Sequence, residues 1–546
     1  MKEIMMLRQL ERGVQDSLRR WDEARGIPVP PTGYPDTRFI GFVVSTWLTA
    51  LAHPQSVYAG SEELQEKTLR ALHALQQDRR PSGCFDLSSC NFDSAPDTAF
   101  TVNALTDARQ VAAGAPLSRK EELLAALDEI ILRACEGICA GGFHTPNHRW
   151  AISACLLQGA ALTGREDFAA KARVYLGEGL DIDTAGEFAE RSTGTYNAVN
   201  DEQMIRLYLC TREREYLDAA RSNLELMRHY LEPDGSLFTL NSTRQDRGHK
   251  PAPSSYYPLY LMTGMLLEDE TFAAWSQVIW EACASLGETP RGLIWLMRFP
   301  QLREWLERGT PDRQPLLEDR RVWPASGIGR WRRGALSVTA LAHQPCFLSV
   351  ANGQVNLQAS IYANVCAQRN FVPDAVEETP TGFRLHSRAD SWYYLPFEGD
   401  GPDTRDWWAM DNPATRRRQI RDAMDLTVTG DLVEGGLQLT IRAEGLSGVP
   451  LRLELSFSPG ILRGEQFVMD AKPGGSILLT GGRAELLGES GDCLTISPCF
   501  AAHRVMNRMG GALPEDPSRF TVYLTGVTPL QQTLLLGTER LFGPVI

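Results

Sequence analysis

Two short stretches place polar side chains of a catalytic type at the expected starts of helices. Residues 145–153 read TPNHRWAIS, and residues 190–201 read ERSTGTYNAVND. The first stretch holds Asn147 and His148, and the second holds Tyr196 and Asn197. An amide or a protonated imidazole can stabilise a growing negative charge, while a phenol can accept and return a proton. These residue types suit the abstraction of a proton beside a carboxylate.

A structural interpretation of the same residues competes with the catalytic one. Asn and Thr are good helix caps, and Pro146 suits the first turn of a helix. The catalytic interpretation therefore requires that the helix starts meet in space.

A weak repeat along the first part of the chain predicts such a meeting. The stretches YPDTRFIGF, APDTAFTVN, TPNHRWAIS and TGTYNAVND begin helical patterns at Pro35, Pro96, Pro146 and Tyr196, at intervals of 61, 50 and 50 residues. Recurring helix pairs of this length indicate a closed or partly closed ring of helical hairpins. The inner helices would point the same way, and their N-terminal ends would form an anion-friendly cleft. Asp97 would then join the four residues named above around one cavity.

The periodicity of the apolar residues changes near residue 320. Before it, apolar residues recur at helical spacing in segments of about fifteen residues. After about Arg321, short alternating runs such as GLQLTIRAE and LRLELSFSP predict antiparallel strands. We therefore expect an α+β multidomain protein, with an (α/α) toroid over residues 1–320 and an antiparallel β-sandwich over residues 321–546. The stretch RGTPDRQPLLEDRR, residues 308–321, reads as the connection.

A polar loop within residues 239–258 is expected at the cleft end of the ring. It is rich in side chains that recognise carboxylates and hydroxyls through forked hydrogen bonds. The candidate substrate-binding residues are Asp97, Arg191, Asn197, Arg244, Gln245, Arg247 and His249. The competing interpretation is a solvated loop held by Arg/Asp pairs.

Composition limits the possible partners. The 546 residues are 43% hydrophobic and 23% charged, with a net charge of −13. This charge argues against nucleic-acid and anionic-membrane partners, which need a basic face. The N-terminal segment lacks the apolar core of a signal peptide, so we expect a cytoplasmic protein. The eleven cysteines are scattered, which favours reduced thiols over a disulfide framework.

Together these features resemble the heparinase II/III and alginate lyase group of polysaccharide lyases. The resemblance rests on a helical toroid followed by a β-sandwich, on the Asn147–His148 pair, and on Tyr196 in ERSTGTYN, 48 residues after His148. It implies that Asn147 or His148 neutralises a uronate carboxylate and that Tyr196 donates a proton. In some members of the group this tyrosine also acts as base. His148 is the alternative base. The implied partner is an acidic oligosaccharide or polysaccharide.

The sequence departs from that group in its second half. Many members add a histidine or a His/Asp metal site from the β-domain, but FLSVANGQVNLQASIY holds neither, and only His343, His386 and His503 follow residue 320. We therefore expect no required metal and no cofactor.

Other functions fit the same residues. A uronyl hydrolase would need a pair of acids across the cleft, for which Asp97 and Glu190 are the candidates. A uronate carbon-5 epimerase would share the proton abstraction. A non-catalytic protein that binds acidic glycans would use the same contacts. Ultraviolet absorbance of an unsaturated uronate product distinguishes a lyase from the hydrolase and the binding protein.

Overall fold

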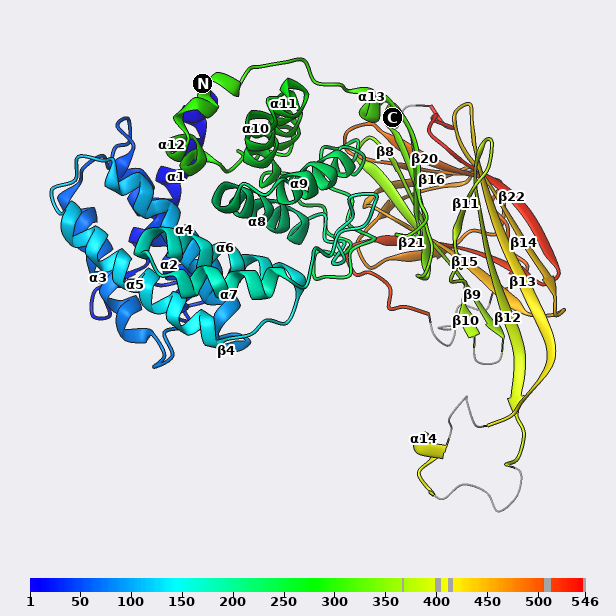
Figure 1. Ribbon diagram of the computed structural model, residues 1–546. Coiled ribbons are helices and arrows are strands. Elements are labelled where there is room, and N and C mark those ends of the chain that lie inside the picture. Colours follow the sequence, from blue (N-terminus) through cyan, green and yellow to red (C-terminus); the bar gives the residue numbers. More distant parts are fainter. Residues whose placement is uncertain (366–367, 398–403, 411–415, 505–511, 544–546) are drawn as a thin grey trace. The chain divides into compact units, whose positions relative to one another are not determined.

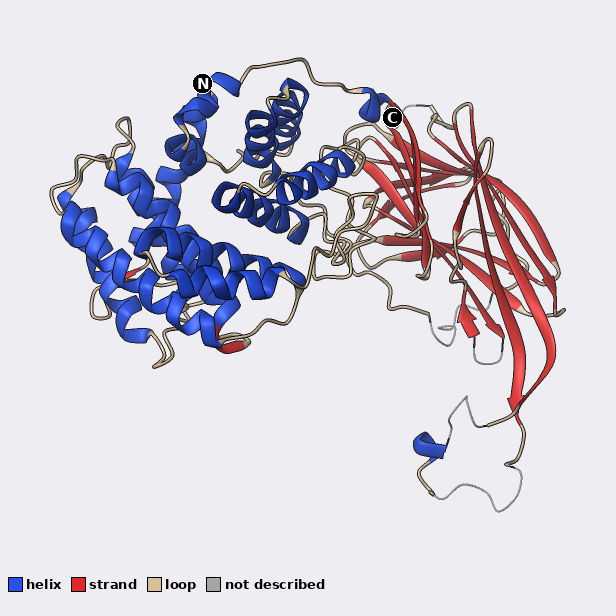
Figure 2. Ribbon diagram, in the orientation of Figure 1, coloured by secondary structure: helices blue, strands red, loops and turns tan. Residues whose placement is uncertain are grey.

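The protein is described by a computed structural model over residues 1–365, 368–397, 404–410, 416–504 and 512–543 (Figure 1). The chain divides into two units. The first consists of Met1–Leu231 with Gly235–Asp312, and the second of Glu232–Asp234 with Arg313–Ile546. Helices dominate the first unit and strands the second (Figure 2). The predicted fold class is thereby confirmed. The expected boundary between residues 320 and 321 falls inside strand β5 (Glu318–Trp323), while the two units divide between Asp312 and Arg313.

The first unit is built from helical hairpins. Its helices are α1 (Lys2–Arg19), α2 (Thr37–Ala52), α3 (Glu62–Asp78), α4 (Ala95–Ala113), α5 (Lys120–Ala140), α6 (Pro146–Thr163), α7 (Glu166–Leu176), α8 (Tyr196–Thr211), α9 (Arg214–Met227), α10 (Tyr256–Leu267), α11 (Glu270–Ser285), α12 (Leu293–Arg298) and the 3₁₀ helix η1 (Pro300–Trp305). Two small hairpins accompany them, β1 (Trp21–Asp22) with β2 (Ile27–Pro28) and β3 (Phe85–Leu87) with β4 (Asn91–Ser94).

Alternate helices form the inner layer of this unit. α2 packs on α4, α4 on α6, α6 on α8 and α8 on α10, while α3, α5 and α7 lie outside and contact one another in turn. The helix starts follow local rules. The Asp36 carboxylate caps α2 by accepting from the backbone N–H groups of Arg38 and Phe39, and Ser94 caps α4. The four predicted helix starts, at 35, 96, 146 and 196, all begin inner helices.

Several buried polar side chains of the inner helices bond to one another. The Asn103 amide of α4 donates to the Gln203 side chain of α8 and to the Ala151 carbonyl of α6, and accepts from Gln158 of α6. Further along the same helices, the buried Asp107 carboxylate pairs with the guanidinium groups of Arg206 (α8) and Arg298 (α12). Arg206 and Arg298 hold the pKa of Asp107 below its usual range, against the burial that would raise it.

The second unit contains two packed sheets. Its strands are β5 (Glu318–Trp323), β6 (Ile328–Arg333), β7 (Leu336–Leu341), β8 (Cys346–Asn352), β9 (Val355–Val365), β10 (Gln368–Asn370), β11 (Val376–Glu378), β12 (Gly382–Tyr394), β13 (Arg418–Val433), β14 (Gly436–Gly445), β15 (Pro450–Phe457), β16 (Gly460–Gly464), β17 (Phe467–Ala471), β18 (Ser476–Leu478), β19 (Ala484–Leu487), β20 (Cys493–Ser497), β21 (Phe520–Val527) and β22 (Leu530–Gly537), with short helices α13 (Gln314–Leu317) and α14 (Trp407–Met410).

The strand order explains the single core of this unit. One sheet runs β18-β21-β15-β9-β8-β7-β6-β5, with β10 paired to β9, and the other runs β11-β12-β13-β14-β22-β20-β19-β16-β17. Alternate side chains point inward, so that Phe383 and Leu385 of β12 are buried while Arg384 is exposed. Side chains of both sheets, such as Leu453 and Ile441, share one apolar core. Pairing among the described strands is antiparallel except for β18 beside β21.

Two features lie outside the site. The ten described cysteines are free thiols, and Cys366 lies outside the described residues. Within the described chain, no helix combines the length and the apolar character needed to cross a bilayer.

The connection between the two units provides a test of the division of the chain by limited proteolysis. Residues 308–314 carry no regular structure before Gln314, and most of their side chains are exposed. We expect limited proteolysis to cut first within residues 308–314, because exposed irregular backbone enters a protease site more readily than helix or strand. Mass spectrometry of the fragments checks this. First cuts inside α4, α6 or α8 would contradict the division of the chain.

Candidate functional site

The N-terminal ends of α4, α6 and α8 lie at the same end of the ring. The hydrogen bonds of Asn103 join the third turn of α4 to the second turn of α6 and to the third turn of α8, so the three helices run in the same direction and nearly in register. Asp97 starts α4, Asn147 and His148 start α6, and Tyr196 is the first residue of α8. The structure therefore brings these predicted residues to one end of the inner layer.

Asn147 is completely buried and is engaged with a carboxylate. Its Nδ2 atom donates to both Oε1 and Oε2 of Glu190 at 2.8 Å and to the Thr145 hydroxyl at 2.8 Å. Its Oδ1 atom is buried without a hydrogen-bond partner among the described residues. The side chain thus accepts no helix N–H group, which removes the capping interpretation. Its donors face Glu190 and Thr145.

Tyr196 lies beneath a guanidinium group. The Cζ atom of Arg244 is 4.8 Å from the centre of the Tyr196 ring, and the Arg244 Nε atom is 3.6 Å from Glu190 Oε1. The Arg244 side chain is 27% exposed, and its Nε atom is buried without a hydrogen-bond partner among the described residues. Asn147, Glu190, Arg244 and Tyr196 therefore form one continuous chain of contacts.

His148 is half-buried among charges of both signs. Its ring meets the Phe100 ring edge to face, with centroids 6.1 Å apart, and lies 6.1 Å from the His144 ring. Burial lowers the pKa of His148 from 6.5 to about 4. The neighbouring charges of His144, Arg244 and Arg38 also lower this pKa, and Asp97 opposes them. His148 is therefore a neutral imidazole at neutral pH.

Asp97 is held by groups from its own helix start and from α2. Its carboxylate accepts from the Ser94 hydroxyl at 2.7 Å and from the Asn91 amide at 3.0 Å, and it pairs with Arg38 at 3.4 Å. Arg38 also lies over the rings of Phe42 and Phe100. Asp97 thus fixes a cation close to His148.

The other predicted binding residues fall into two groups. Arg191 follows Glu190 in a left-handed backbone conformation, with φ of 47°, and Gln245, Arg247 and His249 are exposed on the loop that carries Arg244. Asn197 differs, because it is completely buried and its Nδ2 atom faces the Met227 sulfur at 3.8 Å. The structure does not bring Asn197 together with the exposed residues.

Sequence reasoning undervalued three contributors to this site. Glu190 was considered only as a hydrolase acid, yet it joins Asn147 to Arg244. Arg38 stands in YPDTRF at the position that alanine holds in APDTAF, so the repeat itself marked it as different. Asp246 lies in the polar loop of residues 239–258 but was not among the candidate residues, yet it accepts a hydrogen bond from Ser192.

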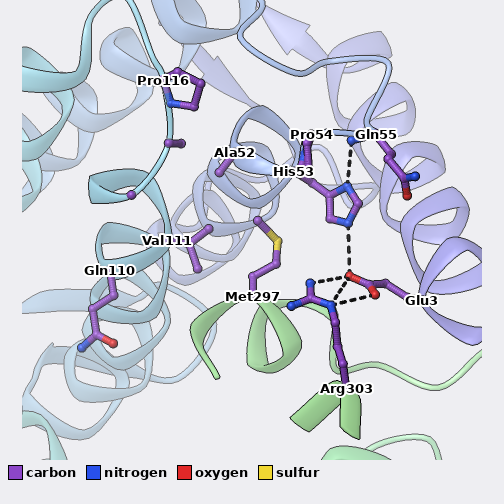
Figure 3. A pocket seen from close by; sticks show the side chains of 12 residues that line it. Glu3, Ala52, His53, Pro54, Gln55, Gln110, Val111, Pro116, Met297 and Arg303 are labelled. Carbon is purple, nitrogen blue, oxygen red and sulfur yellow. Dashed lines mark hydrogen bonds and ion pairs between the residues drawn. The ribbon is translucent and has the colours of Figure 1, made fainter. Parts of the chain in front are cut away.

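A separate cavity lies elsewhere in the helical unit. It has a volume of about 590 Å³ and is lined at the C-terminal ends of α2 and α4, by residues that include His53 and Gln110. In Figure 3, Glu3 lies between His53 and Arg303, which bind its carboxylate at 3.4 and 2.6 Å. None of the predicted site residues lines this cavity.

Comparisons with known proteins bear on the fold. No protein-family model and no curated protein matches the sequence. Among solved structures, a xanthan lyase from Paenibacillus matches 99% of this chain with 10% sequence identity and a TM-score of 0.61, and this chain spans 57% of its length.

Two further solved structures cover more of their own length. A chondroitin AC lyase from Streptomyces coelicolor A3, in complex with chondroitin sulphate, matches 98% of this chain and 80% of its own, with 13% identity and a TM-score of 0.55. A heparinase III matches 97% of this chain and 85% of its own, with 10% identity and a TM-score of 0.57. The resemblance predicted from the sequence is thus confirmed for the fold: the chain has the helical toroid and β-sandwich of polysaccharide lyases.

Proposed function

We propose that this protein is a polysaccharide lyase that cleaves a uronic-acid-containing glycan by β-elimination. The observation that carries the proposal is the meeting of a neutral imidazole, a phenol and a guanidinium at one end of the inner helices, in His148, Tyr196 and Arg244. The solved structures of similar fold support it, since they are lyases of xanthan, chondroitin and heparin by their names.

The reaction needs three groups. The proton on carbon 5 of the uronate leaves to a base, the double bond forms between carbons 4 and 5, and the bond from carbon 4 to the glycosidic oxygen breaks as that oxygen takes a proton. The uronate carboxylate must be neutralised meanwhile, because negative charge grows on it as the carbon 5 proton departs.

Arg244 is the group that we assign to the uronate carboxylate. Its side chain is partly exposed, and a guanidinium is a planar fork that matches a carboxylate. Nearby cations add to the attraction for an anionic sugar, since Arg38 and Arg244 both lie close enough to lower the pKa of His148.

His148 and Tyr196 are the proton-transfer groups of this proposal. A neutral imidazole accepts a proton readily, so His148 suits the removal of the carbon 5 proton when that proton faces α6. Tyr196 suits the protonation of the leaving oxygen and serves both steps when the two lie on one face. Among the described residues, the Tyr196 hydroxyl has no hydrogen-bond partner, which leaves it available to substrate.

Asn147 acts in this proposal through Glu190. Its amide donors stabilise the buried Glu190 carboxylate, which in turn faces Arg244. Hydrolysis by an Asp97 and Glu190 pair is less well supported, because both carboxylates are already bound by donors of the protein.

The first prediction of the proposed mechanism concerns Tyr196. Tyr196→Phe keeps the ring and its contact with Arg244 but removes the group that exchanges a proton, so turnover should fall by at least about 10²-fold. The melting temperature should change little. Absorbance of the unsaturated product, with a panel of acidic oligosaccharides, measures this. A fully active Tyr196→Phe protein would contradict the mechanism.

A second prediction separates Asn147 from a purely structural role. Asn147→Ala leaves the buried Glu190 carboxylate without its main donors, so unfolding should become easier by about 1–3 kcal/mol. Turnover should also fall, because Glu190, the counter-charge of Arg244, is no longer held in place by the Asn147 amide. Denaturant melts and initial rates on the same preparations test both effects. Loss of stability with unchanged turnover would reduce Asn147 to a structural residue.

A third prediction concerns pH. Because the pKa of His148 is lowered in the folded protein from 6.5 to about 4, the unfolded chain binds the extra proton first as pH falls. Stability contributed by neutral His148 is present above pH 6.5 and is lost as pH falls towards about 4. The wild-type protein should therefore lose stability more steeply across this window than His148→Gln. Parallel slopes in thermal melts would show that His148 titrates normally.

A further inference from the structure

Asp246 joins the two loops that carry Tyr196 and Arg244. Its Oδ1 atom accepts from the Ser192 hydroxyl at 2.9 Å and from the Ser242 hydroxyl at 2.6 Å. Its Oδ2 atom accepts from the Gly194 backbone N–H group at 2.9 Å. One carboxylate therefore receives three donors, two from the segment before α8 and one from its own loop.

Each of the two serines also holds a residue of the site. The Ser192 hydroxyl accepts from the backbone N–H group of Tyr196 at 3.0 Å, and the Ser242 hydroxyl accepts from the backbone N–H group of Arg244 at 3.1 Å. Because both hydroxyls donate to the same Asp246 oxygen, the backbones of Tyr196 and Arg244 are linked through one atom. This link lies beside the place where the Arg244 guanidinium covers the Tyr196 ring.

The surrounding packing leaves this arrangement little freedom. A Cβ atom at Gly194 would come within 2.9 Å of Asp246 Oδ2 and 2.8 Å of the Pro251 ring, so only glycine allows the two loops to approach this closely. The adjacent Thr193 is completely buried, donates to the Phe238 carbonyl and accepts from the Tyr256 hydroxyl at 2.6 Å. Movement of Asp246 would therefore be transmitted to both loops.

We propose that Asp246 is a positioning residue that sets the Arg244 guanidinium over the Tyr196 ring through Ser192 and Ser242. The contact itself is a property of the folded chain, while its effect on turnover rests on the lyase function proposed above. Asp246 touches no reacting atom in this scheme. It determines where the phenol and the cation stand relative to each other.

The test uses Asp246→Asn in the full-length protein. The amide keeps the shape of the carboxylate but replaces one accepting oxygen with a donor, so at least one of the three donors loses its acceptor. We expect the turnover number to fall about tenfold or more, since small misplacements of catalytic groups are costly. In the Tyr196→Phe background, the same substitution should cause little further loss, because the two act on one step.

A spectroscopic readout separates this proposal from the lyase function. With tyrosine labelled at the ring carbon that bears the hydroxyl, the resonance of Tyr196 is identified by its absence from Tyr196→Phe. Asp246→Asn should shift that resonance, because the guanidinium moves relative to the ring. This measurement needs no substrate. Absence of any lyase activity would overturn the proposed function, while the resonance would still judge the role of Asp246.

Matched controls exclude a general loss of stability. Asp269 caps α11 by accepting from the Thr271 N–H group, and Ser61 caps α3 through Leu64, both away from the site. Asp269→Asn and Ser61→Ala should keep wild-type turnover and the wild-type Tyr196 resonance. Ser242→Ala, which removes one of the three donors, should reproduce a part of the Asp246→Asn effect and serves if that variant does not fold.

Two results would overturn the proposal. One is an Asp246→Asn protein with wild-type turnover and an unshifted Tyr196 resonance. The other is an equal fold-loss of turnover in the wild-type and Tyr196→Phe backgrounds, which would indicate a structural effect independent of the phenol.

Discussion

The helical unit depends on the hydrogen bonds and ion pairs between polar side chains that are buried among its inner helices. An amide or a carboxylate that lies buried between the inner helices is costly unless it finds a partner. Asn103, Gln158 and Gln203 therefore bond to one another, and Arg206 and Arg298 enclose Asp107. These bonds tie α4 to α6, α8 and α12. They fix the rotation and the register of each helix, and so determine which residues its N-terminal turn presents.

At the N-terminal ends of the helices, the buried charges are less completely paired. Glu190 is a buried carboxylate whose donors come from Asn147, with Arg244 at a longer distance of 3.6 Å. Arg244 consequently has a counter-charge beside it, while its side chain remains partly exposed. A cation in that position is held in place without being fully neutralised. In the function proposed above, an anionic sugar completes the coordination of Arg244, which would recognise negative charge in a chain whose net charge is −13.

Periodicity was sufficient to predict the architecture, and spacing was sufficient to predict the helix starts that carry Asp97, Asn147, His148 and Tyr196. Contacts between loops were not predictable in the same way. The partner of Asn147 is Glu190, 43 residues later, and Arg244 reaches Tyr196 from a loop without periodic pattern. The burial of Asn197 was also missed. Whether a residue at a helix start faces the interior depends on how the helix is rotated about its axis, and the packing of all the inner helices determines that rotation. The lowered pKa of His148 depends on four neighbours from separate segments.

Low sequence identity with lyases of the same fold indicates which features the fold itself requires. A chain that matches a xanthan lyase over 99% of its length at 10% identity shares with it a layered arrangement of elements rather than particular side chains. Apolar volume and helical spacing can be supplied by many sequences, since cores tolerate extensive substitution at constant volume and pattern. A buried charge is more restrictive, because Asp107 without Arg206 and Arg298 would be strongly destabilising. Such pairs must change together. The buried ion pairs of the ring are therefore the part of the helical core that tolerates single substitutions least.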